Sequence, residues 1–357
     1  MKWRYAVIGY GFIGRRHVQT LKSFEESDCV AVCDTDPKRL AEARALYPEM
    51  PVYETAEDLF AHEKLDGVII SANNRAHKEL VVLAAKAGVN IICEKPAALT
   101  VREFDEMMEA VEEAGVSFTV HQQRRFDKDF QTVKTVFDQG LVGDMYLVRS
   151  QLFGYNGNMH DWHRFKAEGG GMLYDWGVHL IDQILYMVPG RIESVYADIR
   201  NVINAEVDDY FDISLRFACG LDAHIELGTY LLNSQPGWFE RHWYAAGTTG
   251  CAVVNKFEPE GSIIRTTHLL ENVAEDQDKS AASYGPTRSF GVPEPGLIVE
   301  EPLPEALHEQ RDWFVNYFRA LAGEEEFLVK PEEVRRVLSV MEACRRSAET
   351  RRSIDFE

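Results

Sequence analysis

The feature that most constrains the fold is a glycine loop close to the start of the chain. Residues 4–8 form an apolar run typical of a strand, and Gly9, Gly11 and Gly14 follow directly as G-x-G-x-x-G. We expect a helix to open at Arg15. In this setting the first glycine permits a tight turn, the second lets backbone approach a pyrophosphate, and the third lets helix pack on strand. The loop, including Phe12 and Ile13, therefore predicts a dinucleotide site at a helix N-terminus.

An acidic residue stands where such a site needs one. The next apolar run, residues 30–33, ends in Asp34, 20 residues beyond the third glycine. That is the expected place of a carboxylate binding the ribose 2′-hydroxyl. A carboxylate repels the 2′-phosphate of NADP, so we predict NAD, although Lys38 and Arg39 could accommodate that phosphate. The alternative for Asp34 is a helix cap before Pro37.

Strand and helix patterns alternate through the first third of the chain. Helices are expected at 37–46, 76–87 and 100–114, and further strands at 66–71, 91–95 and 117–120. This alternation indicates a parallel, doubly wound sheet, whose carboxyl edge is where ligands bind. Asn73 and His77 follow one of these strands and are expected to line the cofactor crevice. A solvent-facing position in the first turn of a helix is the alternative for His77.

A Glu-Lys-Pro corner ends the strand that begins at residue 91. Proline cannot continue a sheet ladder, so Glu94 and Lys95 should lie at the carboxyl edge, where the Lys95 ammonium can point into the crevice. An ordinary turn with a solvated lysine is the alternative. Farther along, Asp175, His179 and Asp182 have the i, i+4, i+7 spacing that places side chains on one helix face. A structural charge network is the alternative there.

The second part of the chain predicts a different architecture. After residue 190 the segments 192–203, 210–218, 221–231 and 238–246 alternate with a period near two, which indicates an antiparallel meander. Helices are expected at 126–139, 172–187, 304–322 and 331–350. A polar loop is expected from about residue 271 to residue 301, either covering a substrate or merely mobile.

Together these residues resemble the Gfo/Idh/MocA family (glucose–fructose oxidoreductase and inositol dehydrogenase). The matching pieces, in family order, are the glycine loop, His77, Glu94-Lys95-Pro96, Arg124-Arg125-Phe126, and Gly169-Gly170-Gly171 leading to Asp175 and His179. The resemblance implies an α/β protein with a Rossmann domain, residues 1–122, and a second α/β domain, residues 123–357, with a large, mostly antiparallel open sheet. It also implies NAD(P), hydride transfer on a sugar, cyclitol or related polyol, and a homo-oligomer.

These expectations assign roles to individual residues. Oxidation of a secondary alcohol needs a base, which we assign to His179, and a partner for the developing alkoxide, which we assign to Lys95. Asp175 is expected to hold substrate hydroxyl groups and to favour the productive state of the other two. Arg124, Trp162, His163 and Arg164 are the further candidates for substrate contact, although a packed loop at the domain junction is the alternative for the last three.

Composition excludes several classes of partner. The net charge of −20 argues against nucleic acid, which is bound through Lys and Arg, and against an anionic membrane surface. No apolar run approaches a membrane span, no signal-peptide pattern is seen, and the six cysteines contain no C-x-x-C pair, so we expect a cytoplasmic protein with reduced thiols. A metal site built from His160, His163, Asp175 and His179 is the rejected rival, because its spacing matches no zinc motif.

Two other functions remain open from the sequence. One is a glycoside-cleaving hydrolase or lyase in which bound NAD is reduced and regenerated in each turnover. The other is a non-catalytic NAD(H)-binding sensor. Net release of NADH separates a dehydrogenase from the first, and nucleotide binding without turnover would indicate the second.

Overall fold

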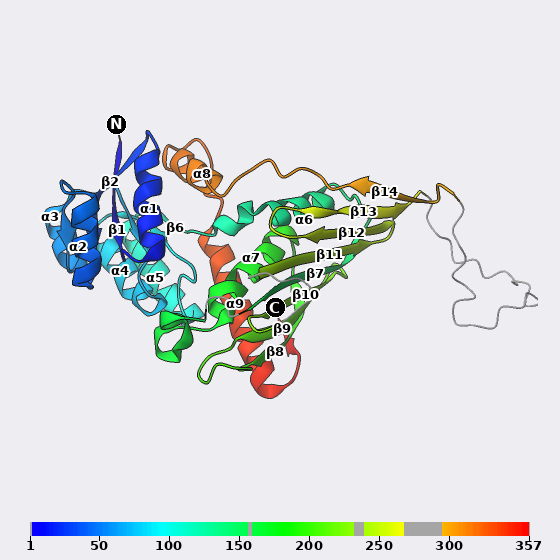
Figure 1. The fold of residues 1–357 in the computed structure, drawn as a ribbon. Coiled ribbons are helices and arrows are strands. Elements are labelled where there is room, and N and C mark those ends of the chain that lie inside the picture. Colours follow the sequence, from blue (N-terminus) through cyan, green and yellow to red (C-terminus); the bar gives the residue numbers. More distant parts are fainter. Residues whose placement is uncertain (1, 156–158, 232–238, 268–294, 357) are drawn as a thin grey trace, which may run out of the picture.

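The computed structural model describes residues 2–155, 159–231, 239–267 and 295–356. Two sheets lie in separate parts of the molecule, and helices pack on both (Figure 1). The first sheet is built from the N-terminal third of the chain and the second from the rest. The predicted combination of a parallel and a mostly antiparallel sheet is confirmed.

The first sheet has six parallel strands in the order β3-β2-β1-β4-β5-β6. Its strands are β1 (Trp3–Ile8), β2 (Ser27–Cys33), β3 (Val52–Tyr53), β4 (Gly67–Ile70), β5 (Asn90–Cys93) and β6 (Phe118–Val120). Its helices are α1 (Phe12–Ser23), α2 (Pro37–Leu46), α3 (Ala56–His62), α4 (His77–Lys86) and α5 (Val101–Ala114). All residues of β4 are buried, as expected for a parallel strand covered on both faces. The order reverses between β1 and β4, which is where such sheets bind ligands.

Two details of this half differ from the prediction. Helix α1 begins at Phe12, inside the glycine loop, and not at Arg15. This brings the first free N–H groups of the helix into the loop itself. Strand β3 and helix α3 were not predicted, because two strand residues are too few to show an alternating pattern.

The second sheet has nine strands in the order β14-β13-β12-β11-β7-β10-β9-β8-β15. They are β7 (Met145–Gly154), β8 (Ile192–Arg200), β9 (Tyr210–Phe217), β10 (Asp222–Gly228), β11 (Phe239–Gly247), β12 (Gly250–Asn255), β13 (Glu260–Thr266), β14 (Ile298–Pro302) and β15 (Ile354–Asp355). The predicted simple meander is wrong at the centre, where β7 lies between β10 and β11 and pairs with β10 in parallel. A period of two shows that a segment is a strand but does not identify its neighbour.

Helices α6 (Lys128–Asp138), α7 (Val178–Met187) and α9 (Pro331–Thr350) pack on the second sheet, α6 against β11 and β12, α7 against β10 and α9 against β8. The alternating burial along β9 fits a sheet with one covered face. The helix expected from residue 304 begins only at residue 312, as α8 (Asp312–Leu321). Before it, the backbone oxygens of Pro304 and His308 accept hydrogen bonds from side chains of α6.

The expected loop at 271–301 is wrong at its end, because residues from Ile298 onward pair with β13 as β14. Its larger part, up to residue 294, lies outside the described residues. No disulfide occurs among the described cysteines, of which Cys29, Cys33, Cys93 and Cys344 are buried, as predicted, while Cys219 is exposed. Among the helices that the structure describes, none combines the length and apolar character needed to cross a membrane.

A buried ion pair joins α6 to the large sheet. Arg241 and Asp129 are almost fully buried, and the Arg241 Nε donates to Asp129 Oδ2 over 2.8 Å. Trp243 Nε1 donates to the same carboxylate oxygen over 2.7 Å. The other guanidinium nitrogens donate to Ser150 Oγ and Gln183 Oε1. The two buried charges are thus paired, and every guanidinium nitrogen is hydrogen-bonded, while Asp129 Oδ1 has no hydrogen-bond partner among the described residues.

Candidate active site

The glycine loop has the shape that a pyrophosphate needs. Gly9 has φ +92°, and a Cβ there would lie 2.5 Å from Ser71 O, while a Cβ on Gly14 would lie 1.9 Å from Gly9 O. Neither position accepts a side chain. At Gly11, by contrast, the nearest atom is Arg39 Nη1 at 3.8 Å, so the second glycine leaves room for a ligand. Phe12 and Ile13, which follow it in the first turn of α1, are exposed.

Asp34 accepts a hydrogen bond from the glycine loop and also lines the neighbouring cavity. Its Oδ2 accepts the N–H of Tyr10, inside the glycine loop, over 2.6 Å, and its Oδ1 accepts the N–H of Asp36 over 2.8 Å. Arg39 Nη1 lies 3.3 Å from Oδ2. Beside them is a cavity of about 760 Å³, lined by Gly9, Asp34 and Asn73 among others. These residues fit the adenosine end of a dinucleotide, with the pyrophosphate at the loop.

Lys95 and Asp175 meet across the two halves of the molecule. The Lys95 Nζ, beyond the end of β5, donates to both the backbone oxygen and Oδ1 of Asp175, each over 2.8 Å. Asp175 lies in a π-helical turn (Leu173–Gly177) that precedes α7, where the N–H of Val178 bonds to the oxygen of Leu173. Single π turns inside helices occur frequently at functional sites. The predicted helix over 172–187 is confirmed as one continuous helical segment, except that residues 173–177 have π geometry in place of α geometry.

His179 lies one turn farther along this helix and is 2% exposed. Its Nδ1 lies 2.8 Å from Gln122 Oε1. Because an amide oxygen only accepts, Nδ1 carries the hydrogen and Nε2 is the basic nitrogen. Burial, followed by the charges of Lys95 and Arg124, lowers the pKa of His179 well below its usual value. The ring is therefore neutral at neutral pH and able to accept a proton.

The loop between β7 and α7 reaches the site through His163. Its Nε2 lies 3.9 Å from Asp175 Oδ1, and its ring stacks on Trp162 with centroids 3.8 Å apart. Burial lowers the pKa of His163. Arg164 is instead exposed, with its guanidinium over the Phe165 ring at 5.5 Å.

Arg124 lies between the site and the second sheet. Its guanidinium is 4.0 Å from the centre of the Trp176 ring and 2.8 Å from Asp127 Oδ2. The charge of Arg124 also lowers the pKa of His179, after burial and Lys95. It is thus near the predicted base, held by an aromatic ring and a carboxylate.

The remaining predicted cofactor residues have different environments. Asn73 is exposed beside the cavity. His77 is fully buried, with Nδ1 2.9 Å from Pro96 O and Nε2 3.0 Å from Ala72 O. Its ring therefore joins the loops that follow β4 and β5.

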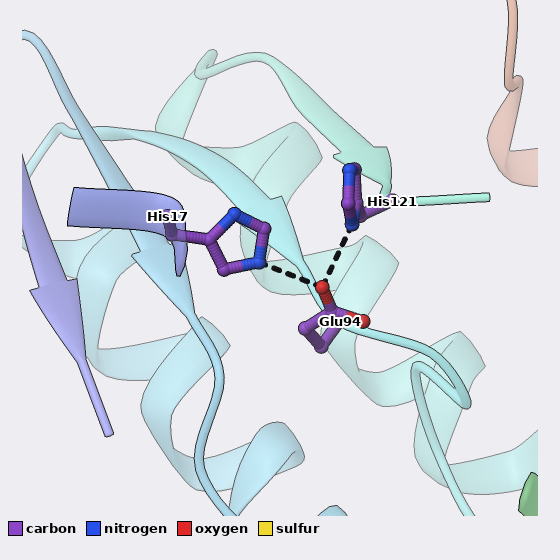
Figure 2. A group of neighbouring side chains, drawn as sticks. All are labelled: His17, Glu94 and His121. Atoms are coloured by element: carbon purple, nitrogen blue, oxygen red, sulfur yellow. Dashed lines mark hydrogen bonds and ion pairs between the residues drawn. The ribbon is translucent and has the colours of Figure 1, made fainter. Parts of the chain in front are cut away.

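Glu94 is buried next to two histidines that the sequence analysis did not identify, His17 and His121 (Figure 2). Within the described ranges, this is the one group of His, Cys, Asp or Glu side chains close enough together to hold a metal ion. The three histidines of the rejected metal site, His160, His163 and His179, are not part of it. No sequence motif identifies His17 or His121. Gln122 was missed too, although His121 and Gln122 are the first two residues beyond β6 and so lie at the same sheet edge as Lys95.

The parallel sheet, the glycine loop and the carboxylate beyond β2 define a dinucleotide-binding domain of the Rossmann type. A family model described as "Oxidoreductase family, NAD-binding Rossmann fold" matches residues 3–122, and the model of the GFO/IDH/MocA C-terminal domain matches residues 130–253. The chain belongs to the Gfo/Idh/MocA family of oxidoreductases.

Similar proteins extend this result over the whole chain. A solved NAD-binding protein from Listeria innocua is 32% identical, with a TM-score of 0.87, and the match covers 100% of this chain and 97% of that one. The 2,7-anhydro-N-acetylneuraminate hydratase of Mediterraneibacter gnavus is 27% identical over 96% of this chain and 94% of its own. The myo-inositol 2-dehydrogenase of Thermotoga maritima is 28% identical over 61% of this chain and 66% of its own.

Proposed function

We propose that the protein is an NAD-dependent dehydrogenase that oxidises a secondary alcohol of a sugar, cyclitol or related polyol. The observation that carries the proposal is the meeting of Lys95, Asp175 and His179 at the carboxyl edge of a dinucleotide-binding sheet. Relatives named for inositol and apiose dehydrogenation support the substrate class. We assign residues 1–122 to cofactor binding and 123–357 to substrate binding and to formation of a homo-oligomer.

We divide the chemistry among three side chains. When bound, NAD supplies the acceptor for the hydride. The neutral His179 takes the hydroxyl proton at Nε2, because Gln122 holds the hydrogen on Nδ1. Lys95 stabilises negative charge on the substrate oxygen. Asp175 holds the Lys95 ammonium in place from two oxygens and binds a substrate hydroxyl.

NAD is the proposed cofactor, in preference to NADP. Asp34 places a negative charge at the ribose end of the cavity, and its own hydrogen bonds to the loop keep it there. Arg39 is already paired with Asp34 and Asp36, which weakens it as a partner for a 2′-phosphate. A lower dissociation constant for NADP(H) than for NAD(H) would contradict this assignment.

The second candidate is a reaction in which bound NAD is reduced and regenerated without net NADH. His163 favours it, because a second histidine beside Asp175 offers a further acid or base for adding or eliminating a leaving group. The relative named as an anhydro-sugar hydratase supports this class. The third possibility, an NAD(H) sensor, does not explain why the Lys95 ammonium and the basic imidazole of His179 lie near each other.

The deciding experiment measures NADH formation by the purified protein with NAD across sugars, glycosides, inositols, sugar acids and anhydro sugars. NADH released with one compound supports the dehydrogenase. Conversion of a glycoside or anhydro sugar without NADH release supports the second candidate. NAD binding with no conversion of any compound would refute both enzymatic proposals.

Two variants test the assigned roles once a substrate is known. Lys95→Ala and His179→Ala should each reduce turnover by about two orders of magnitude or more, the usual scale for acid–base catalysis. Dissociation constants for NAD should stay close to wild type, since neither side chain lies in the adenosine cavity. Near-normal turnover in either variant would contradict the assignment.

A further inference from the structure

A second set of titratable side chains surrounds Glu94, the residue that precedes Lys95 in the chain. Glu94 follows β5, and its Oε1 is 2.7 Å from His17 Nε2, on α1, and 2.8 Å from His121 Nδ1, beyond β6 (Figure 2). The other carboxylate oxygen, Oε2, accepts the backbone N–H of Lys95 over 3.2 Å. One carboxylate thus connects two histidines from separate elements to the backbone of the proposed catalytic lysine.

The cluster is cut off from water. His17, Glu94 and His121 are 2%, 7% and 8% exposed, and a carboxylate without water must find its hydrogen bonds within the protein. Aromatic side chains of α8 cover the rings: the His121 centroid is 4.8 Å from that of Trp313 and 5.3 Å from that of Phe314. This packing fixes which nitrogen of each histidine faces Glu94.

The distances identify the contacts as hydrogen bonds. Two histidines and a glutamate are a ligand set that zinc accepts, but ligand atoms on a tetrahedral zinc lie about 3.3 Å apart, given bonds of 2.0–2.1 Å. The nitrogen–oxygen distances of 2.7 and 2.8 Å are shorter and match hydrogen bonds to a charged acceptor. His17 therefore donates from Nε2 and His121 from Nδ1.

We propose that His17 and His121 are positioning residues that keep Glu94 ionised and fixed. Glu94 thereby holds the backbone of Lys95 in position and places a negative charge beside the reacting groups. This inference rests on the proposed function, in which Lys95 stabilises the substrate oxygen. It explains why a carboxylate is buried immediately next to that lysine.

The charge of Glu94 has a wide influence. The titratable groups around it come from several elements: His17 on α1, His77 on α4, His121 after β6, His179 on α7, and the neighbouring Cys93 and Lys95. Burial would raise the pKa of Glu94, but the contacts with His121 and His17 reverse this and hold it well below its usual value. Without both donors the pKa must rise, so Glu94 would bind a proton at a pH where the wild type stays ionised.

Matched variants separate the hydrogen bonds from the packing. His17→Gln keeps a donor where Nε2 lies, and His121→Asn keeps one where Nδ1 lies. The pair His17→Leu and His121→Leu removes both donors and retains apolar bulk. A triple variant that adds Glu94→Gln to the leucine pair shows whether a carboxyl signal in the infrared spectrum comes from Glu94 itself.

The first readout needs no substrate. Infrared difference spectra recorded along a titration from acid to neutral pH should show that a carboxyl group of the leucine pair is still protonated near neutral pH. The band should be absent near neutral pH from the Gln/Asn pair, and absent once Glu94→Gln is added. NADH affinity, followed by its fluorescence, and thermal unfolding are measured on the same samples.

The second readout uses the substrate found by the panel. In the leucine pair the protonation of Glu94, in place of that of His179, should set the acid limb of the kcat profile, because the active enzyme needs Glu94 ionised. The limb should therefore move up by at least one pH unit, and turnover at pH 7 should fall at least tenfold. The Gln/Asn pair should restore most of the turnover and the wild-type limb. If the leucine pair does not fold, His121→Leu alone is judged by the same two readouts.

Two results would overturn the proposal. One is a lower unfolding temperature with no carboxyl band and an unmoved acid limb, which would show that the histidines only pack. The other is one equivalent of metal in the purified wild type that is lost from the leucine pair. Absence of turnover on every substrate would sink the proposed function but leave the infrared test decisive for Glu94.

Discussion

Gln122 offers the sharpest test of the proposed base, because it touches His179 without needing to touch the substrate. Its Oε1 lies 2.8 Å from Nδ1 of the buried ring, and this contact keeps Nε2 free of hydrogen. We consider two substitutions. Gln122→Leu removes the acceptor, and Gln122→Glu replaces it with an acceptor that carries a negative charge.

The expected magnitudes differ for the two variants. A hydrogen bond of this kind contributes about 0.5–1.5 kcal/mol, so Gln122→Leu should lower kcat about twofold to tenfold at a tenfold loss per ~1.4 kcal/mol. A carboxylate next to the ring favours imidazolium and raises its pKa by about 1–3 units. The neutral ring is the active form, so activity is lost as pH falls through that pKa. In the Gln122→Glu variant the acid limb should therefore move to higher pH by about 1–3 units.

The assay is the initial rate of NADH formation between about pH 5 and pH 9, with saturating NAD and the substrate identified by the panel. NADH affinity and the unfolding temperature of each variant serve as controls for the fold. An acid limb that stays in place in Gln122→Glu, in a folded protein that binds NADH normally, would refute His179 as the general base. A hundredfold loss in Gln122→Leu would show that Gln122 does more than orient the ring.

Two further predictions concern the cofactor and the fold. Asp34→Ala should weaken NAD binding about tenfold or more by calorimetry, because it removes a charged acceptor of both the ribose and the Tyr10 N–H; an unchanged dissociation constant would contradict this. Asp129→Ala should lower the free energy of unfolding in urea by about 3–5 kcal/mol, because it leaves the buried Arg241 charge without its partner. Lys128→Ala, which breaks an exposed pair one position away, is the control and should change stability little.

The sequence was sufficient for every strand of the first sheet except the two-residue β3, because each signal there is local. The glycine loop and the apolar runs depend on residues near one another in the chain. The parallel pairing of β7 with β10 joins segments about 70 residues apart, and nothing in either segment specifies the other. Pairing of this kind is decided by the packing of the whole sheet.

The candidate site likewise contains residues that local sequence motifs identify and residues that they do not. Lys95 and Asp175 are recognisable because each sits in a motif, but the 2.8 Å contact between them appears only when the two halves of the chain meet. Gln122 and His17 lie in no motif of their own, and what they do depends on the side chains they face. Arg164 stays a prediction, since its side chain is exposed and lies over Phe165, away from the contacts that join Lys95, Asp175 and His163.

Helix α8 packs on the first sheet but is synthesised long after it. It packs beside α1 on the first sheet (Figure 1), with the Tyr317 hydroxyl 2.9 Å from that of Tyr5 and the Phe318 ring 5.4 Å from that of Phe24. About 190 residues separate the end of β6 from the start of α8. At about 5–20 residues per second the ribosome needs roughly 10–40 s to make them. Throughout that interval Tyr5 and Phe24 lack the aromatic partners that α8 gives them in the complete chain.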